Sequence, residues 1–247
     1  MNPFYFGRSE RRLFGIYDAP AIPNAAKRAA ILCYPWGPEY LHAHRTMRQL
    51  ALKLSAAGFH TLRFDYFGTG DSGGEPTDVD LEGCEADLET AIEEIKDIAG
   101  TTRITLIGLR LGASIAASVA ARPSCRIDSL VLWDVVISGA QYLQQLGVPP
   151  NAEPPFEALG CPLSSTLLRD LRMWELSLEV VVNLPLTLVL LTERLPSHGV
   201  LAPRYGDSNM AAHTIEFRED VRPWLETIAN KGLVPFTAIQ RIVTWLE

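Results

Sequence analysis

The sequence lacks the excess of basic residues that polyanionic partners require. Lys and Arg together number 22 and Asp and Glu number 29, so the formal net charge is -7. Nucleic acids and anionic membranes attract basic surfaces, because neutralised phosphates supply much of the binding free energy. We therefore expect neither nucleic acid nor an anionic membrane as a partner of this protein.

The sequence also lacks closely spaced cysteines and long apolar runs. Its four cysteines lie far apart with no C-x-x-C pair, which favours reduced thiols over disulfides or a zinc site. The most apolar run, residues 181–191, contains Asn183 and Pro185 and is too short to cross a bilayer. The N-terminal residues do not show the basic start and following apolar run that are typical of a signal peptide. We expect a cytoplasmic protein with no membrane span, bound metal or cofactor.

What the sequence does contain is an alternation of strand-like and helix-like segments. Its 247 residues are enough to bury one large core, and 47% of them are hydrophobic. Strands are expected at residues 29–35, 59–66, 103–109, 128–136, 185–193 and 213–219. Helices are expected at residues 44–58, 80–100, 111–122 and 235–247, and an antiparallel edge pair at residues 8–20. This order predicts an α/β fold with a mostly parallel sheet and helices on both faces.

One segment, residues 137–183, interrupts this alternation. It holds a proline-rich loop at residues 147–162 and then a helix-like stretch at residues 163–176. An insertion between two core strands lies at the carboxyl end of the sheet, where open α/β sheets bind ligands. We therefore expect a single domain, residues 1–247, with a small helical lid at residues 137–183.

The strongest motif is G-L-R-L-G, from Gly108 to Gly112. It lies between a buried strand and a helix rich in small residues. This is the frame of the nucleophile elbow G-x-S-x-G, in which the glycines permit a sharp turn from strand to helix. Arg110 stands where the serine belongs. A guanidinium remains protonated and has no acceptor lone pair, so Arg110 cannot attack a carbonyl carbon as serine does.

Three stretches around this motif, residues 34–74, 106–117 and 130–139, resemble the α/β-hydrolase superfamily. The nearest branch is that of the serine-aminopeptidase-like and exosortase-associated hydrolases, some of whose members also read G-L-R-L-G at the elbow. The resemblance covers nearly the whole chain and is densest in residues 31–140. It implies an α/β-hydrolase fold, a lid, and a pocket under that lid.

The resemblance also implies roles for particular residues. An oxyanion hole would use the backbone N–H of Leu111 and one from the loop at Trp36 and Gly37. The acid of a catalytic triad would be Glu193 or, one strand earlier, Asp134; a salt bridge at a strand end is an equal alternative for each. The triad histidine should follow the last strand, but no histidine occurs after residue 213 in this sequence.

Other residues offer substitutes for parts of the missing triad. Cys33 ends a strand beside the oxyanion loop and would need a cation such as Arg110 to lower its pKa. Ser114 lies one turn into the helix, where we expect it to be buried against the sheet. His44 begins a helix near the same loop and is expected to face the pocket as a polar contact or proton donor. His198 comes before the last strand and His213 begins it. Either could reach the site through a mobile loop, but a surface role is expected for each.

These observations leave two classes of function open. In the first, the protein acts on an acyl, ester or thioester-like small molecule, free or carrier-bound, with Arg110 as an electrostatic anchor in hydrolase, lyase or cyclase chemistry. In the second, it is an inactive relative that binds a ligand or partner in a biosynthetic or export pathway. An Arg110 paired with Asp134 or Glu193 in a filled cleft would favour the second class, and a free Arg110 in a deep cavity the first.

Overall fold

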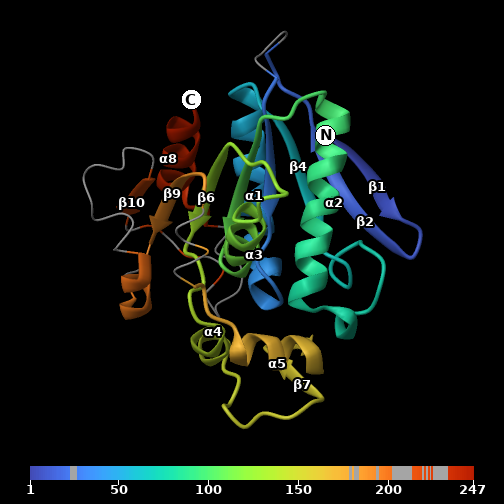
Figure 1. Ribbon diagram of the computed structural model, residues 1–247, viewed down its shortest axis with the longest axis vertical. Coiled ribbons are helices and arrows are strands. Elements are labelled where there is room, and N and C mark those ends of the chain that lie inside the picture. Colours follow the sequence, from blue (N-terminus) through green and yellow to red (C-terminus); the bar gives the residue numbers. More distant parts are fainter. Residues whose placement is uncertain are drawn as a thin grey trace.

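The computed structural model of the chain describes most of the sequence. The described residues are 1–22, 27–177, 180, 184–192, 195–201, 213–218, 220, 222, 224 and 233–247. One eight-stranded sheet organises them, in the order β1-β2-β4-β3-β5-β6-β9-β10 (Figure 1). The strands are β1 (Asn2–Arg8), β2 (Arg11–Asp18), β3 (Ala29–Cys33), β4 (His60–Asp65), β5 (Ile104–Leu109), β6 (Ser129–Trp133), β9 (Leu186–Leu191) and β10 (His213–Phe217).

The sheet is parallel from β4 to β10 and antiparallel at the β1–β2 end. Its central strands β3, β5 and β6 are buried along their whole length, as expected for strands covered on both faces. This confirms the predicted α/β-hydrolase architecture. The β1–β2 pair begins at Asn2, earlier than the sequence indicated, because the aromatic stretch before Arg8 pairs with β2 throughout.

Helices cover both faces of the sheet. On one face, α1 (Pro38–Ala56) and α8 (Phe236–Leu246) bury Met47, Leu50 and Ile239 against the inner strands. On the other face, α2 (Leu81–Ala99) and α3 (Leu111–Ala120) bury Leu88 and Ala117. Helix α2 begins and ends where the sequence predicts. Its N-cap is Asp80, which accepts from the backbone N–H of Gly83 at 2.6 Å.

Helix α1 begins six residues before the predicted start at His44. Gly37 caps it with a φ of 63°, and Pro38 occupies its first position, where a missing N–H costs nothing. Because the first turn reads as a loop in the sequence, Glu39 is not recognised there as a helical residue. This shift matters for the site, since it places Glu39 beside the elbow.

The segment between β6 and β9 forms a layer of its own at the lower end of Figure 1. It contains α4 (Gly139–Gln145), a hairpin of β7 (Phe156–Ala158) and β8 (Cys161–Leu163), and α5 (Ser165–Met173). Helices α4 and α5 pack against each other through Gly139, where an added Cβ would lie 2.1 Å from the Leu171 carbonyl oxygen. Neither α4 nor the hairpin was expected from the sequence. That this layer serves as a lid stays a prediction.

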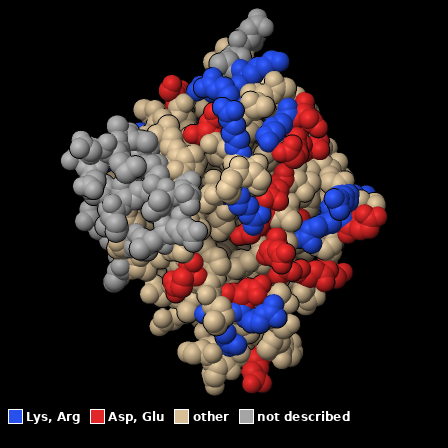
Figure 2. Space-filling model, in the orientation of Figure 1, with Lys and Arg blue, Asp and Glu red and all other residues tan. Residues whose placement is uncertain are grey.

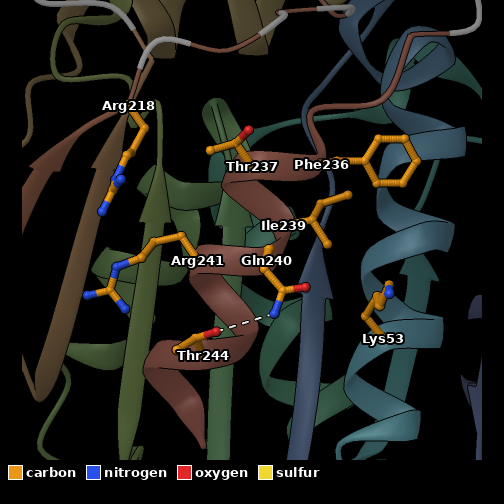
Figure 3. A pocket seen from close by; sticks show the side chains of 8 residues that line it. All are labelled: Lys53, Arg218, Phe236, Thr237, Ile239, Gln240, Arg241 and Thr244. Atoms are coloured by element: carbon orange, nitrogen blue, oxygen red, sulfur yellow. Dashed lines mark hydrogen bonds between the residues drawn. The ribbon is translucent and has the colours of Figure 1, made fainter.

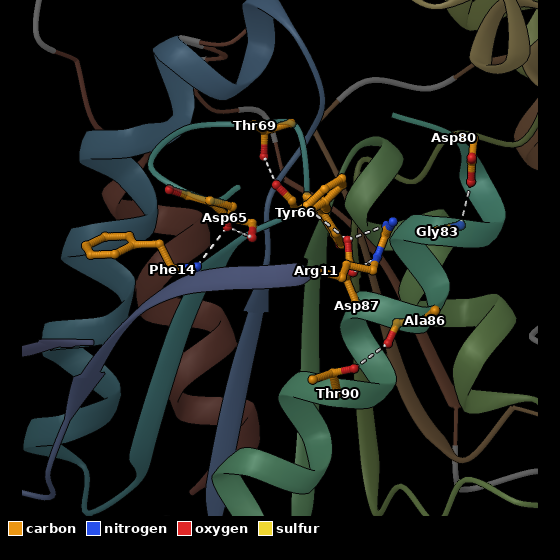
Figure 4. Close-up of polar contacts among 12 residues, drawn as sticks. Arg11, Phe14, Asp65, Tyr66, Thr69, Asp80, Gly83, Ala86, Asp87 and Thr90 are labelled. Carbon is orange, nitrogen blue, oxygen red and sulfur yellow. Dashed lines mark hydrogen bonds and ion pairs between the residues drawn. The ribbon is translucent and has the colours of Figure 1, made fainter. Parts of the chain in front are cut away.

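The glycine-rich loop after β4 is fixed by the carboxylates of Asp65 and Asp87. The Asp65 carboxylate accepts from the backbone N–H of Asp71 at 3.0 Å and from the Tyr40 hydroxyl at 2.8 Å. Asp87 on α2 accepts from the backbone N–H of Phe67 at 2.9 Å and pairs with Arg11 of β2 (Figure 4). The loop is therefore anchored to α1, α2 and the edge hairpin.

The surface carries charges of both signs. On the face shown in Figure 2, Lys and Arg side chains are interspersed with Asp and Glu, with no broad region of one sign among the described residues. Such a mixture is usual for a protein surface. Within the described ranges, no helix is both long and apolar enough to cross a membrane.

Candidate functional site

The turn between β5 and α3 keeps the geometry of a nucleophile elbow. Arg110 has φ 55° and ψ -122°, a backbone conformation that residues other than glycine rarely adopt. Added Cβ atoms at Gly108 and Gly112 would lie only 2.3 Å from backbone atoms, of Ala113 in the first case and of Cys33 in the second. Both glycines are therefore required sterically, and they place the Arg110 side chain at the carboxyl end of the sheet.

Arg110 is 4% exposed and its guanidinium is held by three acceptors. Its Nε donates to Oε1 of Glu39 at 2.9 Å, and its Nη2 donates to Oε1 of Gln145. Its Nη1 makes a longer contact of 3.4 Å with the carbonyl oxygen of Asp134. The guanidinium carbon also lies 5.5 Å from the centre of the Tyr142 ring. We call Arg110, Glu39, Tyr142 and Gln145 the Arg110 cluster.

Glu39 is the counter-ion of this cluster. It is 1% exposed, and its second oxygen accepts from the Tyr142 hydroxyl at 2.9 Å. Burial raises the pKa of Glu39, while Arg110 and Tyr142 act in the opposite direction. Burial lowers the pKa of Arg110, but the interactions with Glu39, Tyr142 and Asp134 together outweigh it, and the pKa lies above its ordinary value. The cluster thus ties α1, the elbow and α4 together.

The space left at the elbow is small. A cavity of about 10 Å³ is lined by Arg110, Tyr142 and Gln145 together with Val135, Val136, Ile137, Ser138, Gln141, Leu195, Ser197 and His198. This is near the minimum that holds one water molecule. His198, expected at the surface, therefore reaches the elbow, and its Nδ1 accepts from the backbone N–H of Leu195 at 3.2 Å. The side chain of His213 lies outside the described residues.

Of the two acids suggested as partners for Arg110, the structure describes one. The Asp134 carboxylate accepts from the backbone N–H of Thr192 at 2.6 Å and from its hydroxyl at 2.5 Å, so it fixes the end of β9. Arg110 reaches only the main-chain carbonyl of Asp134, and the ion pair forms with Glu39 instead. Because the Asp134 carboxylate already accepts two hydrogen bonds from Thr192, it is poorly placed to form an ion pair with Arg110. Glu193 lies outside the described residues.

Cys33 and His44 do not join the Arg110 cluster. Cys33 is fully buried at the end of β3, and burial raises its pKa to about 12. A nucleophilic thiol needs a shift in the other direction. His44 lies against the rings of Tyr34 and Tyr40, with its Nε2 3.4 Å from the Tyr40 hydroxyl. Burial lowers the pKa of His44, and the residue does not line the elbow cavity.

The residues expected to form an oxyanion hole lie next to the elbow. Leu111 is the first residue of α3, so its N–H has no acceptor within the helix. Gly112 packs directly on the carbonyls that precede Trp36 and Gly37. Trp36 is 7% exposed, and Gly37 lies against Cys161 of the β7–β8 hairpin. Proximity therefore agrees with the expectation, while the function of an oxyanion hole stays a prediction.

Sequence reasoning missed Glu39, Tyr142 and Gln145. A buried arginine requires a buried acid as its partner. The sequence suggested acids at the ends of strands for this role and not an acid in the first turn of α1. The signal available in the sequence was Pro38 followed by Glu39, since proline and an acid favour the first turn of a helix. Tyr142 and Gln145 are one turn apart, but α4 itself was not predicted, so no signal linked them to the elbow.

A larger hollow lies far from the elbow, between α1 and α8. It has a volume of about 540 Å³ and is lined by Lys53, Arg218, Phe236, Thr237, Ile239, Gln240, Arg241 and Thr244 (Figure 3). Arg241 is paired with Glu216, and Gln240 donates to the Thr244 hydroxyl at 3.3 Å. In Figure 3, Thr237, Gln240, Arg241 and Thr244 come from α8, while Lys53 comes from α1 and Arg218 from the end of β10.

Solved structures similar to this chain share its whole fold. The structure of Est1E from Butyrivibrio proteoclasticus with ferulic acid bound aligns with a TM-score of 0.75, at 16% identity, over 98% of this chain and 97% of that one. The Pyrococcus furiosus esterase Pf2001 gives a TM-score of 0.68 at 15% identity, over 99% and 89%. The enol-lactonase of Burkholderia xenovorans gives 0.63 at 16% identity, over 98% and 99%. At these identities the likeness is one of fold.

Sequence comparison gives the family. The human protein ABHD12B is 38% identical over 102 residues, which span 38% of this chain and 27% of that protein. The chain therefore matches little more than a quarter of the length of this curated relative. The family described as serine aminopeptidase, S33, matches residues 40–201, from α1 through the elbow to the cavity around His198, which is more than half of the chain. This chain belongs to that hydrolase family.

Proposed function

We propose that this protein is a member of its hydrolase family that binds a small-molecule ligand or a partner and performs no acyl transfer at the elbow. The observation that carries the proposal is the Arg110 cluster. The side chain at the nucleophile position is a cation without an acceptor lone pair. It forms an ion pair with Glu39 and a hydrogen bond with Gln145, and the cavity that it lines measures only about 10 Å³.

The remaining triad positions support the same proposal. No histidine follows β10 in the sequence, and the Asp134 carboxylate is engaged by Thr192. A serine hydrolase needs a nucleophile, a base and an orienting acid within hydrogen-bond reach of one another. With the serine replaced, no histidine after β10 and the Asp134 carboxylate occupied, the protein fits an accessory role in a biosynthetic or export pathway, with a free or carrier-bound small molecule as its ligand.

A second candidate function rests on His198. This residue lines the same cavity as Arg110, together with the hydroxyl groups of Ser138 and Ser197. A histidine beside a fixed cation can move a proton while the cation stabilises a developing oxyanion. The candidate is therefore non-serine chemistry on an ester, thioester or other acyl-like small molecule, with Arg110 as electrostatic anchor and His198 as acid or base.

One experiment separates the two. Acyl esters and acyl thioesters are incubated with wild type, Arg110→Ala and His198→Ala, and products are measured by mass spectrometry. The proposal expects no product above the uncatalysed rate from any of the three proteins. Turnover by wild type that is lost in both variants would establish the second candidate instead. Arg122→Ala serves as a matched control, because Arg122 pairs with Glu85 and Glu89 at a site away from the elbow.

A further inference from the structure

The outer side of the Arg110 guanidinium is occupied by a side chain from α4. Gln145 is an exposed residue at the end of α4, yet its amide oxygen accepts from Nη2 of the buried Arg110. Gln145 also lines the elbow cavity. A neutral amide group thus connects a buried cation to the molecular surface, and it is the most accessible member of the Arg110 cluster.

The charges around Arg110 are already balanced among the described residues. Glu39 pairs directly with Arg110, and Asp134 also acts on it electrostatically. Burial raises the pKa of Asp134, while the hydrogen bonds from Thr192 and the charges of Arg110 and Arg222 act in the opposite direction. Two carboxylates therefore offset two guanidinium groups. A further anion would bring an uncompensated negative charge into a buried site, whereas a neutral carbonyl oxygen would not.

The remaining walls of the cavity suit a small polar group. Ser197, His198 and Gln141 bring groups able to donate hydrogen bonds, while Val135 and Leu195 bring apolar surface. The Ser138 hydroxyl donates to Glu175 at 2.6 Å. With Gln145 in place the free volume is about 10 Å³, so no ligand larger than water fits. Movement of the Gln145 side chain would free the volume of one primary amide next to the Nη2 atom of Arg110.

We propose that the elbow cavity is a binding site for the neutral carbonyl group of an amide or ester, and that the Gln145 side chain occupies it as an internal substitute for that ligand. The ligand carbonyl accepts the hydrogen bond from Arg110 that Gln145 now accepts, and the Gln145 side chain turns into solvent. This inference rests on the ligand-binding function proposed above and adds the chemistry of the ligand and the residue that competes with it.

The test uses small probes matched to the missing group. Replacing Gln145 by Ala removes the equivalent of one acetamide molecule. Dissociation constants for acetamide, methyl acetate and acetate are measured by NMR titration of the full chain, for wild type, Gln145→Ala and Gln144→Ala. Gln144 is the neighbouring exposed glutamine of α4 and lines no part of the cavity, so its variant controls for changes in helix stability.

The expected result is a dissociation constant for acetamide and methyl acetate about tenfold lower in Gln145→Ala than in wild type, since a hydrogen bond to a charged group is regained without competition. Gln144→Ala should behave as wild type, and acetate should gain nothing. Equal gains in both variants, no gain in Gln145→Ala, or a preference for acetate would each overturn the inference. Hydrolysis of methyl acetate by wild type in the same samples would instead overturn the proposed function, so the two failures are distinguishable.

Discussion

Two of the pairs that an arginine forms with a buried carboxylate among the described residues, Arg110–Glu39 and Arg11–Asp87, differ in the exposure of the arginine. In the Arg110–Glu39 pair, the side chains are 5% and 1% exposed. In the Arg11–Asp87 pair, they are 35% and 1% exposed. The first pair lies at the position where its family performs chemistry, and the second anchors a loop at the sheet edge (Figure 4). The same two groups therefore act as a closed internal cluster in one place and as a solvated anchor in the other.

The difference in exposure determines what each pair contributes. A fully buried pair has lost its hydration, so it stabilises the fold only while both partners are present. A partly exposed arginine keeps some of its hydration, and after its removal water molecules can hydrate the carboxylate. The Arg110 cluster is accordingly the more specific of the two and the more sensitive to loss of one member.

The largest expected effect comes from removing the buried counter-ion. Glu39→Leu leaves Arg110 charged, buried and without its partner, and should lower the free energy of unfolding by about 3–5 kcal/mol. Urea denaturation followed by circular dichroism measures this. The double variant Arg110→Met with Glu39→Leu should recover most of the loss, because it removes both charges. A double variant as unstable as Glu39→Leu would show that the loss comes from packing around α1 rather than from the unpaired charge.

A smaller effect is expected at the second pair. Asp87→Ala leaves the backbone N–H of Phe67 without its acceptor and should cost about 1–3 kcal/mol in the same denaturation experiment. Arg11→Ala should cost less than Asp87→Ala, since its partner can then be hydrated through the opening. If Arg11→Ala proves as costly as Glu39→Leu, exposure is not the property that separates the two pairs.

The smallest effect concerns pH. Burial raises the pKa of Glu39 above its ordinary value of 4.5, so the folded state holds this proton more tightly than the unfolded state. The Glu39 contribution to the free energy of unfolding should therefore fall as pH rises from about 4.5 through the raised pKa. The measurement compares wild type with Glu39→Gln at several pH values across this window. A wild type that gains stability relative to Glu39→Gln as pH rises would show that the pull of Arg110 outweighs burial.

These two pairs also show what the sequence could and could not predict. The strands of the core and helix α2 follow from apolar periodicity and from the capping residues Asp80 and Gly100, which act locally. The elbow follows from Gly108 and Gly112, because their spacing has a steric cause. Such features depend on residues close together in the chain.

The partners of Arg110 could not be found in this way. Glu39 is 71 residues and Gln145 is 35 residues from Arg110, and their meeting depends on how α1 and α4 dock on the sheet. The sequence correctly indicated a structural ion pair for Arg110 as one alternative, but it assigned the pair to strand ends. His198 was similarly placed at the surface, since nothing in its neighbours reports the cavity that it lines.

The hydrogen bond from Tyr142 to Glu39 joins residues 103 positions apart. Closing so long a loop is slow, and contacts of this kind form after the local helices and the central strands have come together. The Arg110 cluster is therefore expected to be absent from the transition state for folding. The cluster then stabilises the protein almost wholly by slowing unfolding, so it contributes to the kinetic stability of the native state.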